Sequence, residues 1–149
     1  MSLREACLIV VVALASAGGP VEDTNNAITF VASYRENGPL TFKCKFDVSK
    51  SAADSLTKLK LFTSLDGSVY EPVGSITAEK LTYGLKRKVI TLSGVYGQKS
   101  NLVVTWVSPD DGFCRYYRCN AKGREPNQGK LVEVFQTVQI LSRDGSGCN

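Results

Sequence analysis

The sequence predicts an all-β protein built as two antiparallel sheets packed face to face. The clearest observation is the segment LTFKCKFDV, where apolar residues alternate strictly with polar or charged ones from Leu40 to Val48. Similar period-two segments recur along the chain, separated by turn-forming pairs such as Asp66-Gly67. No long apolar repeat at helical spacing follows residue 20. Short strands with one apolar face each must bury those faces against a second sheet.

The expected strands follow one another with short connections. The first is expected at residues 28–33, and the alternating segment at 40–48 points Cys44 toward the core. The remaining ones are expected at residues 56–63, 69–76, 86–92, 102–107, 116–121 and 131–141. The connections between them are rich in Gly, Pro, Asn, Asp and Ser, as turns require.

The N-terminus is organised as a secretory signal peptide. A basic Arg4 precedes the apolar run ACLIVVVALA, and small residues follow in Ala-x-Ala patterns that end at Ala15 and Ala17. The apolar run is about ten residues, whereas a membrane-spanning helix needs about 20. We therefore expect a signal peptide at 1–17, a lead-in at 18–27, one domain at 28–141 and a tail at 142–149. The product should be secreted, with no stable membrane insertion.

Composition excludes several classes of function. The 149 residues include no histidine, so a Ser/His/Asp triad, a Cys/His dyad and a His-ligated zinc cannot form. The net charge of +4 is too small to indicate nucleic-acid binding. The adjacent carboxylates Asp110 and Asp111 should diverge rather than flank one scissile bond. Neither a phosphate-binding glycine loop nor an EF-hand loop occurs. We expect no enzyme activity and no cofactor.

The cysteines indicate a disulfide framework. Removal of the leader takes Cys7 away and leaves Cys44, Cys114, Cys119 and Cys148. An even number in an oxidising compartment favours disulfides, and four cysteines allow three pairings. Spacing alone does not choose among them. A zinc site is less well supported, because the Cys114 and Cys119 pair has no second close pair to complete a tetrahedral ligand set.

One segment resembles the strand E to strand F signature of immunoglobulin-superfamily domains. It reads Leu102-x-Val104-x-x-Val107-x-x-x-Asp111-Gly112, followed by Tyr117-x-Cys119. The resemblance implies an immunoglobulin-like two-sheet sandwich with an inter-sheet disulfide between Cys44 and Cys119. It also implies that Tyr117 makes a corner hydrogen bond and that Asp111, or alternatively Asp110, ties down the turn before it.

The sequence departs from this family pattern in two places. Extra residues, among them Cys114, separate Asp111 from Cys119. The tryptophan expected on strand C, near Leu59 or Leu61, is missing, and Trp106 falls on strand E instead.

A narrower group shares these departures. The patterns LxLFxSxDGxxYxxVxSI, LxVxWxxP and YxCxAxG are similar to Ig-like domains of secreted molluscan and other invertebrate immune proteins, such as fibrinogen-related and C-type-lectin-related proteins. The similarity covers residues 30–141. It implies a secreted innate-immune protein that recognises microbial or glycan ligands. The alternative is a homotypic adhesion or assembly module of the extracellular matrix or cell surface.

The second pair of cysteines is expected at neighbouring strand ends. The last two strands should form a hairpin, which places Cys114 at the start of one beside Cys148 after the other. A bridge there would fasten the tail to the domain. Two alternatives stay open: Cys114 could pair within the sheet edge, or Cys148 could link two chains in a homodimer.

The candidate ligand-binding residues lie in end loops and basic clusters. The segments 48–55, 66–68 and 122–130 are expected at one end of the sandwich. Basic residues with a tyrosine as a sugar-stacking ring would suit an anionic ligand. The candidates are Lys86, Arg87, Lys88, Arg115, Tyr116, Arg118, Arg124 and Asn127. The alternative is an ordinary solvated exterior, because alternation separates Arg87 from its two lysine neighbours and Arg87 could pair with Asp110 or Asp111.

Overall fold

The computed structural model confirms an all-β sandwich of two antiparallel sheets. It describes residues 14–16, 27–34, 38–85, 89–126, 129–145 and 147–148, the first of these ranges by its backbone only. The strands are β1 (Leu14–Ser16), β2 (Ile28–Tyr34), β3 (Leu40–Asp47), β4 (Ser55–Ser64), β5 (Glu71–Ile76), β6 (Leu81–Tyr83), β7 (Ile90–Val95), β8 (Lys99–Trp106), β9 (Arg115–Arg124) and β10 (Leu131–Ile140). Two short 3-10 turns, η3 (Val48–Lys50) and η4 (Pro109–Gly112), follow β3 and β8.

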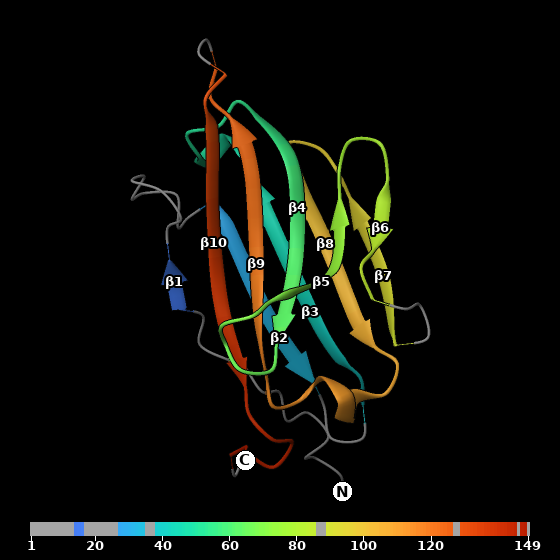
Figure 1. Ribbon diagram of the computed structural model, residues 1–149. Helices are drawn as coiled ribbons and strands as arrows, with labels where there is room; N and C mark the ends of the chain where they lie inside the picture. The colour runs from blue at the N-terminus through green and yellow to red at the C-terminus, as the bar shows by residue number, and fades with distance from the viewer. Residues whose placement is uncertain are drawn as a thin grey trace, which may run out of the picture.

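The strand order identifies the kind of sandwich. One sheet has the order β1-β10-β9-β4-β5-β6, and the other has the order β2-β3-β8-β7 (Figure 1). Without β1, these are the G-F-C-C′-C″ and A-B-E-D orders of the variable-type immunoglobulin sandwich. We call them the six-stranded and the four-stranded sheet. The two-sheet sandwich predicted from alternation, in the immunoglobulin-like form that the resemblance implies, is therefore confirmed.

The core between the sheets is formed by the inward-facing residues of the alternating segments. The inter-sheet disulfide joins Cys44 on β3 to Cys119 on β9, with a Cα–Cα distance of 5.7 Å and a sequence separation of 75. Both cysteines are buried. A loop of this size restricts the unfolded chain by about 4 kcal/mol in the chain-entropy model. Leu59 and Leu61 on β4 are fully buried where the family pattern has its tryptophan.

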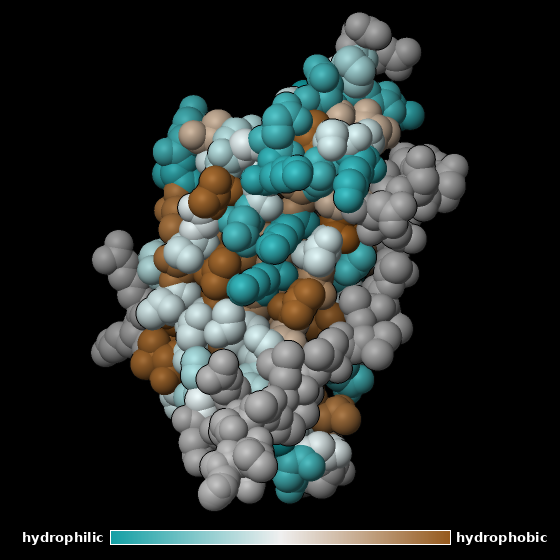
Figure 2. All heavy atoms as spheres, turned by 180° about the vertical axis from the view of Figure 1, so that it is seen from behind, coloured by the Kyte–Doolittle hydropathy of each residue, from teal (hydrophilic) through white to brown (hydrophobic). Residues whose placement is uncertain are grey.

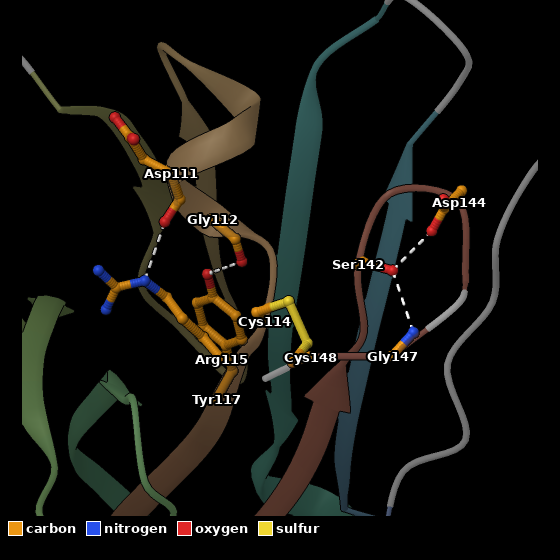
Figure 3. The surroundings of a disulfide bond; sticks show 9 residues. All are labelled: Asp111, Gly112, Cys114, Arg115, Tyr117, Ser142, Asp144, Gly147 and Cys148. Atoms are coloured by element: carbon orange, nitrogen blue, oxygen red, sulfur yellow. Dashed lines mark hydrogen bonds between the residues drawn. A yellow bond between two sulfur atoms is a disulfide. The ribbon is translucent and has the colours of Figure 1, made fainter.

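Trp106 and Tyr117 lie at the end of the core next to the η4 turn, which we call the lower end. The two rings meet edge to face, with centroids 6.5 Å apart. The Tyr117 hydroxyl donates to the Gly112 carbonyl at 2.5 Å, which is the corner hydrogen bond that the resemblance implies (Figure 3). A Cβ on Gly112 would lie 2.7 Å from the side chains of Leu40 and Trp106, so this close approach of the turn requires glycine.

The turn at Asp110 and Asp111 is held differently from the expectation. The amide of Asp111 donates to the Ser108 carbonyl, and its own carbonyl accepts from Arg115 Nε at 2.9 Å (Figure 3). Both hydrogen bonds involve the main chain of Asp111 and not its carboxylate. The carboxylate of Asp110 accepts from Arg143 of the tail at 3.0 Å. Arg87, the partner expected from the sequence, lies outside the described residues.

A second disulfide fastens the C-terminal tail. Cys114 and Cys148 are bonded with a Cα–Cα distance of 5.5 Å (Figure 3), and the Cys114 amide donates to the Leu141 carbonyl. Arg143 lies over the rings of Tyr34 and Phe113, 5.7 and 5.0 Å from their centroids. The bridge, the ion pair and these ring contacts together hold the tail against the lower end of the sandwich.

Some expected elements differ from the structure. The strand expected at 69–76 begins only at Glu71, because Val69 and Tyr70 belong to the preceding loop. The three-residue strand β6 was missed, since so short a segment shows no period. The strand expected at 86–92 is described only from Ile90, and residues 86–88 lie outside the described part.

The predicted grouping of the three loops is wrong. On β4, Ser55 pairs with Arg124, whereas Ser64 pairs with Tyr116 at the far end of β9. A strand carries the chain from one end of the sandwich to the other, so the loops before and after β4 lie at opposite ends. The turn at 66–68 therefore lies away from the loops at 48–55 and 122–130, and it crosses in front of β9 and β10 (Figure 1).

Candidate functional site

The outer face of the six-stranded sheet is arranged in cross-strand rows. In one row, Lys122 of β9 lies between Glu133 of β10 and Lys58 of β4. The next row consists of Phe135, Asn120, Lys60, Ser75 and Thr82, one from each of β10, β9, β4, β5 and β6. Because alternate residues of a strand point to the same face, these side chains share the outer face. The register thus brings together lysines from two distant parts of the chain.

Arg118 fastens the 65–70 loop to this face. Its guanidinium carbon lies 4.3 Å from the ring centroid of Tyr70 and 4.4 Å from that of Phe135. Its Nε donates to Thr137 Oγ1 at 3.3 Å. Each cation–π contact contributes about 0.5–1 kcal/mol at an exposed site. Arg118 is therefore committed to packing rather than presented as a free cation.

Tyr116 packs under the same loop. Gly67 has φ +84°, and a Cβ built on it would lie 3.2 Å from the Tyr116 ring. The loop is also fixed by Asp66, whose carboxylate accepts from the amides of Ser68 and Val69 and from Ser64. These hydrogen bonds hold the pKa of Asp66 well below its usual range. One side of the tyrosine ring is thus covered by an ordered loop.

Three lysines on the outer face of β4 and β9 form no salt bridge within 4.0 Å with any described residue. Lys58 and Lys122 stand directly opposite each other on β4 and β9, and Lys60 follows on the same face of β4. Burial lowers the pKa of Lys60, and the charges of Lys58 and Lys122 lower that pKa further. The Lys60 ammonium also lies 5.0 Å from the Phe62 ring centroid. We call Lys58, Lys60 and Lys122 the lysine cluster.

The acidic residue beside the cluster is engaged elsewhere. Glu133 stands opposite Lys122, yet its carboxylate accepts from the Asn120 side-chain amide at 2.8 Å. Within the described part of the chain, no salt bridge within 4.0 Å involves a lysine of the cluster. Like charges directly opposite on paired strands are destabilising. The arrangement is therefore an unfavourable one for the folded protein by itself.

A shallow groove of about 380 Å³ adjoins the lysine cluster on the β4–β5–β6 side. Lys58 and Lys60 line it from β4, and Lys80 lines it from the turn between β5 and β6. Hydroxyl groups line it as well, from Ser75, Thr77 and Thr82. We call this set of six residues the hydroxyl–lysine groove. Its described lining residues include cations and hydroxyl groups but no carboxylate.

The outer face of the four-stranded sheet is different. Figure 2 shows it with hydrophilic and hydrophobic side chains interspersed. Its lysines Lys43 and Lys45 stand opposite Val103 and Asn101, and Lys99 stands opposite Asp47. A hydrogen bond from Ser49 lowers the pKa of Asp47, and the charges of Lys99 and Lys50 lower it further. Here the cross-strand charge pair has opposite signs.

The candidates predicted on β9 and at its ends do not form one patch. Tyr116 and Arg118 share the outer face, but Arg115 points to the other side, 5.4 Å from the Trp106 ring centroid. Arg124 donates to the Gly129 carbonyl at 2.8 Å and so belongs to the hairpin turn. Arg115 therefore does not share a surface with Tyr116 and Arg118, because residues of opposite parity on a strand face opposite ways.

Other predicted candidates lie outside the described residues. These are Lys86, Arg87, Lys88 and Asn127. Sequence reasoning also missed the residues that the structure does bring together, namely the lysine cluster. Part of the signal was visible, because alternation in LTKLKLFT places Lys58 and Lys60 on one face opposite the buried leucines.

The described residues contain no group of three or more His, Cys, Asp or Glu that could hold a metal ion. Among the same residues, no helix is long and apolar enough to cross a membrane. No family model and no curated protein matches the chain. The class of protein is therefore defined by its fold: a variable-type immunoglobulin-like sandwich with two disulfides.

Proposed function

We propose that this protein is a secreted immunoglobulin-like recognition module of innate immunity that binds anionic glycans, including those of microbial surfaces. The observation that carries the proposal is the lysine cluster, in which Lys58 and Lys122 oppose each other and, among the described residues, no lysine of the cluster forms a salt bridge. A bound anion would neutralise the charges that the fold leaves unpaired. The proposal is for binding without catalysis.

Electrostatics supports this surface as a binding site. The three lysines are half-buried, and a solvent-accessible group of like charges raises the local concentration of anions and accelerates their association. The cost of the opposed lysines is of the order of 0.2–1 kcal/mol, which the free protein bears and an anionic ligand relieves. Functional sites commonly retain such locally unfavourable arrangements.

The proposed setting rests on other observations. The leader-like residues 1–17, whose removal would take β1 (Leu14–Ser16) from the sheet edge, favour secretion, and two disulfides suit an oxidising compartment. The immune role and the superfamily relationship rest on the resemblance across residues 30–141, to which the strand order adds support. A fold by itself hosts many functions, so the ligand class is argued from the lysine cluster.

A homotypic adhesion or assembly module is the second candidate. Val31 on β2 and Val95 on β7 are 40% and 62% exposed on the two edge strands of the four-stranded sheet. Exposed strand edges with apolar side chains can pair with a second chain. This reading predicts self-association without any ligand.

One experiment separates the two candidates. The oxidised, secreted protein is tested against a panel of anionic and neutral glycans and microbial surfaces, at low and high salt, while its molar mass is followed. We expect selective binding to anionic glycans that is lost at 0.5 M salt, where the Debye length is about 4 Å. Concentration-dependent association with no glycan binding would instead favour the homotypic module.

A further inference from the structure

We propose that the hydroxyl–lysine groove is a subsite for a tetrahedral oxyanion, a sulfate or phosphate ester carried by a glycan. This inference rests on the proposed function and narrows its ligand class. The carrying observation is that three lysines and the hydroxyl side chains of two strand residues line one groove, with no carboxylate among its described lining residues: Lys58, Lys60, Lys80, Ser75 and Thr82.

The register explains how the groove acquires both kinds of donor. Lys60 on β4 stands opposite Ser75 on β5, which stands opposite Thr82 on β6. Neighbouring strands lie about 4.8 Å apart, so this row spans about 10 Å across the sheet. Lys58 lies two residues from Lys60, about 7 Å along β4. The groove is therefore as wide as one or two sugar rings and has cations along one wall.

Lys80 completes the groove from a fixed turn. The Thr77 amide donates to the Lys80 carbonyl at 3.0 Å, and Thr77 Oγ1 accepts from the amides of Glu79 and Lys80 at 3.3 Å. The Thr77 hydroxyl donates to the Lys80 carbonyl at 3.4 Å, so its proton is used within the turn. The turn is thus held by its own side chain. Glu79 belongs to the turn but does not line the groove. Lys80 faces Lys58 and Lys60 across the hydroxyl row.

This combination favours an ester oxyanion over a carboxylate. A sulfate or phosphate ester presents three acceptor oxygens around one centre, whereas a carboxylate presents two in one plane. Lysine ammonium groups and hydroxyl groups converging from three strands can satisfy the larger set. Serine and threonine hydroxyls donate to such oxygens in shorter, stronger charge-assisted hydrogen bonds.

The test compares three polymers of defined chemistry. A heparin-type oligosaccharide supplies sulfate esters, its fully desulfated and N-acetylated counterpart retains only carboxylates, and a polyglycerol phosphate supplies phosphate esters. We expect the desulfated polymer to bind at least tenfold more weakly than the sulfated one. The phosphate polymer tells which of the two esters the groove accepts better.

The variants Thr82→Val and Lys80→Met are then compared with Thr91→Val and Lys43→Met on the four-stranded sheet. Valine keeps the β-branched shape of threonine, so the strand is retained. We expect each groove variant to weaken binding of the preferred ester polymer about tenfold, a size typical for loss of one hydrogen bond to a charged group. The two control variants should bind like the parent protein.

Two results would overturn the inference while the proposed function stands. One is equal affinity for the sulfated and the desulfated polymer. The other is unchanged affinity of both groove variants while substitution of Lys122 still weakens binding. Failure of every polymer to bind the parent protein would overturn the proposed function and this inference together.

Discussion

The outer faces of the two sheets differ in the signs of the charged residues that stand opposite each other on neighbouring strands. On the four-stranded sheet, the cross-strand partners Asp47 and Lys99 have opposite charges. On the six-stranded sheet, Lys122 stands between the like-charged Lys58 and the acidic Glu133, whose carboxylate is hydrogen-bonded to Asn120. Opposite charges at such positions stabilise a sheet and like charges destabilise it. The charged pair on the four-stranded sheet therefore stabilises the folded chain, whereas the pair of lysines on the six-stranded sheet does not.

This difference between the two faces favours the lysine cluster as the place where a ligand binds. The only carboxylate beside the lysine cluster, among the described residues of its row, is Glu133, and that group is hydrogen-bonded to Asn120. The neighbouring Arg118 is enclosed by Tyr70 and Phe135. The cations that remain available are the lysines. Lysines occur on both faces, so the two faces are distinguished by the residues that stand opposite the lysines rather than by the number of lysines.

The largest expected effect comes from charge reversal on one face at a time. Lys58→Glu combined with Lys60→Glu should weaken anionic-glycan binding about a hundredfold, since each lysine contributes about a factor of ten. The same change in net charge at Lys43 and Lys45 should alter affinity by less than about twofold. Surface plasmon resonance at low salt measures both. Equal losses from the two double variants would show that only net charge matters.

A smaller effect is expected from the arginine that holds the loop. Arg118→Met should lower the free energy of unfolding by about 1–2 kcal/mol, because two cation–π contacts are lost. Urea denaturation measures the change, and limited proteolysis should show faster cleavage within the 65–70 loop. Lys45→Met on the other face serves as the control. A loop that stays protected in the arginine variant would contradict its assigned role.

Charge exchange at the two cross-strand pairs should move stability in opposite directions. Lys58→Glu creates an opposite-charge pair with Lys122 and should raise the free energy of unfolding by about 0.2–1 kcal/mol. Lys99→Glu opposes Asp47 with a like charge and should lower it by a similar amount. Both are read from denaturant midpoints at low salt. Changes of the same sign would remove the distinction between the faces.

The smallest effect concerns the titration of Lys60. Its pKa is lowered in the folded protein by burial and by Lys58 and Lys122, so the fold disfavours its charged form. This cost is present below the folded-state pKa and is relieved as the pH rises through that value. Lys122→Met should raise the pKa of Lys60 toward its ordinary value. NMR titration of the lysine side chains measures it, and an unmoved pKa would mean that Lys122 contributes nothing.

Much of the fold could be predicted from the sequence because its signals are local. Strict alternation around Cys44 and the Tyr117-x-Cys119 pattern fixed the strands, the direction of the side chains and the sheets that the disulfide joins. The face shared by Lys58 and Lys60 was also readable from alternation. These features depend on neighbours within one strand.

The site itself depends on pairing between distant segments. Lys122 meets Lys58 only through the register of β9 on β4, where an irregularity lies between Leu56 and Lys58. No local pattern predicts such a register. The position of the 65–70 loop over the sheet likewise depends on contacts of Tyr70 with Arg118. Local patterns therefore favoured basic residues close together in the sequence, such as Arg115 and Arg118, which the strand turns to opposite sides.

The most direct test of the lysine cluster as a binding site is to map which residues an anionic ligand contacts. Amide NMR spectra of the isotope-labelled, oxidised protein are followed during titration with a sulfated oligosaccharide. If the ligand binds at the lysine cluster and the hydroxyl–lysine groove, we expect shifts concentrated on β4, β5, β6 and β9 around Lys58, Lys60 and Lys122. Shifts concentrated on β3 and β8, around Lys43 and Lys45, would contradict this binding site, as would an unchanged spectrum at saturating ligand.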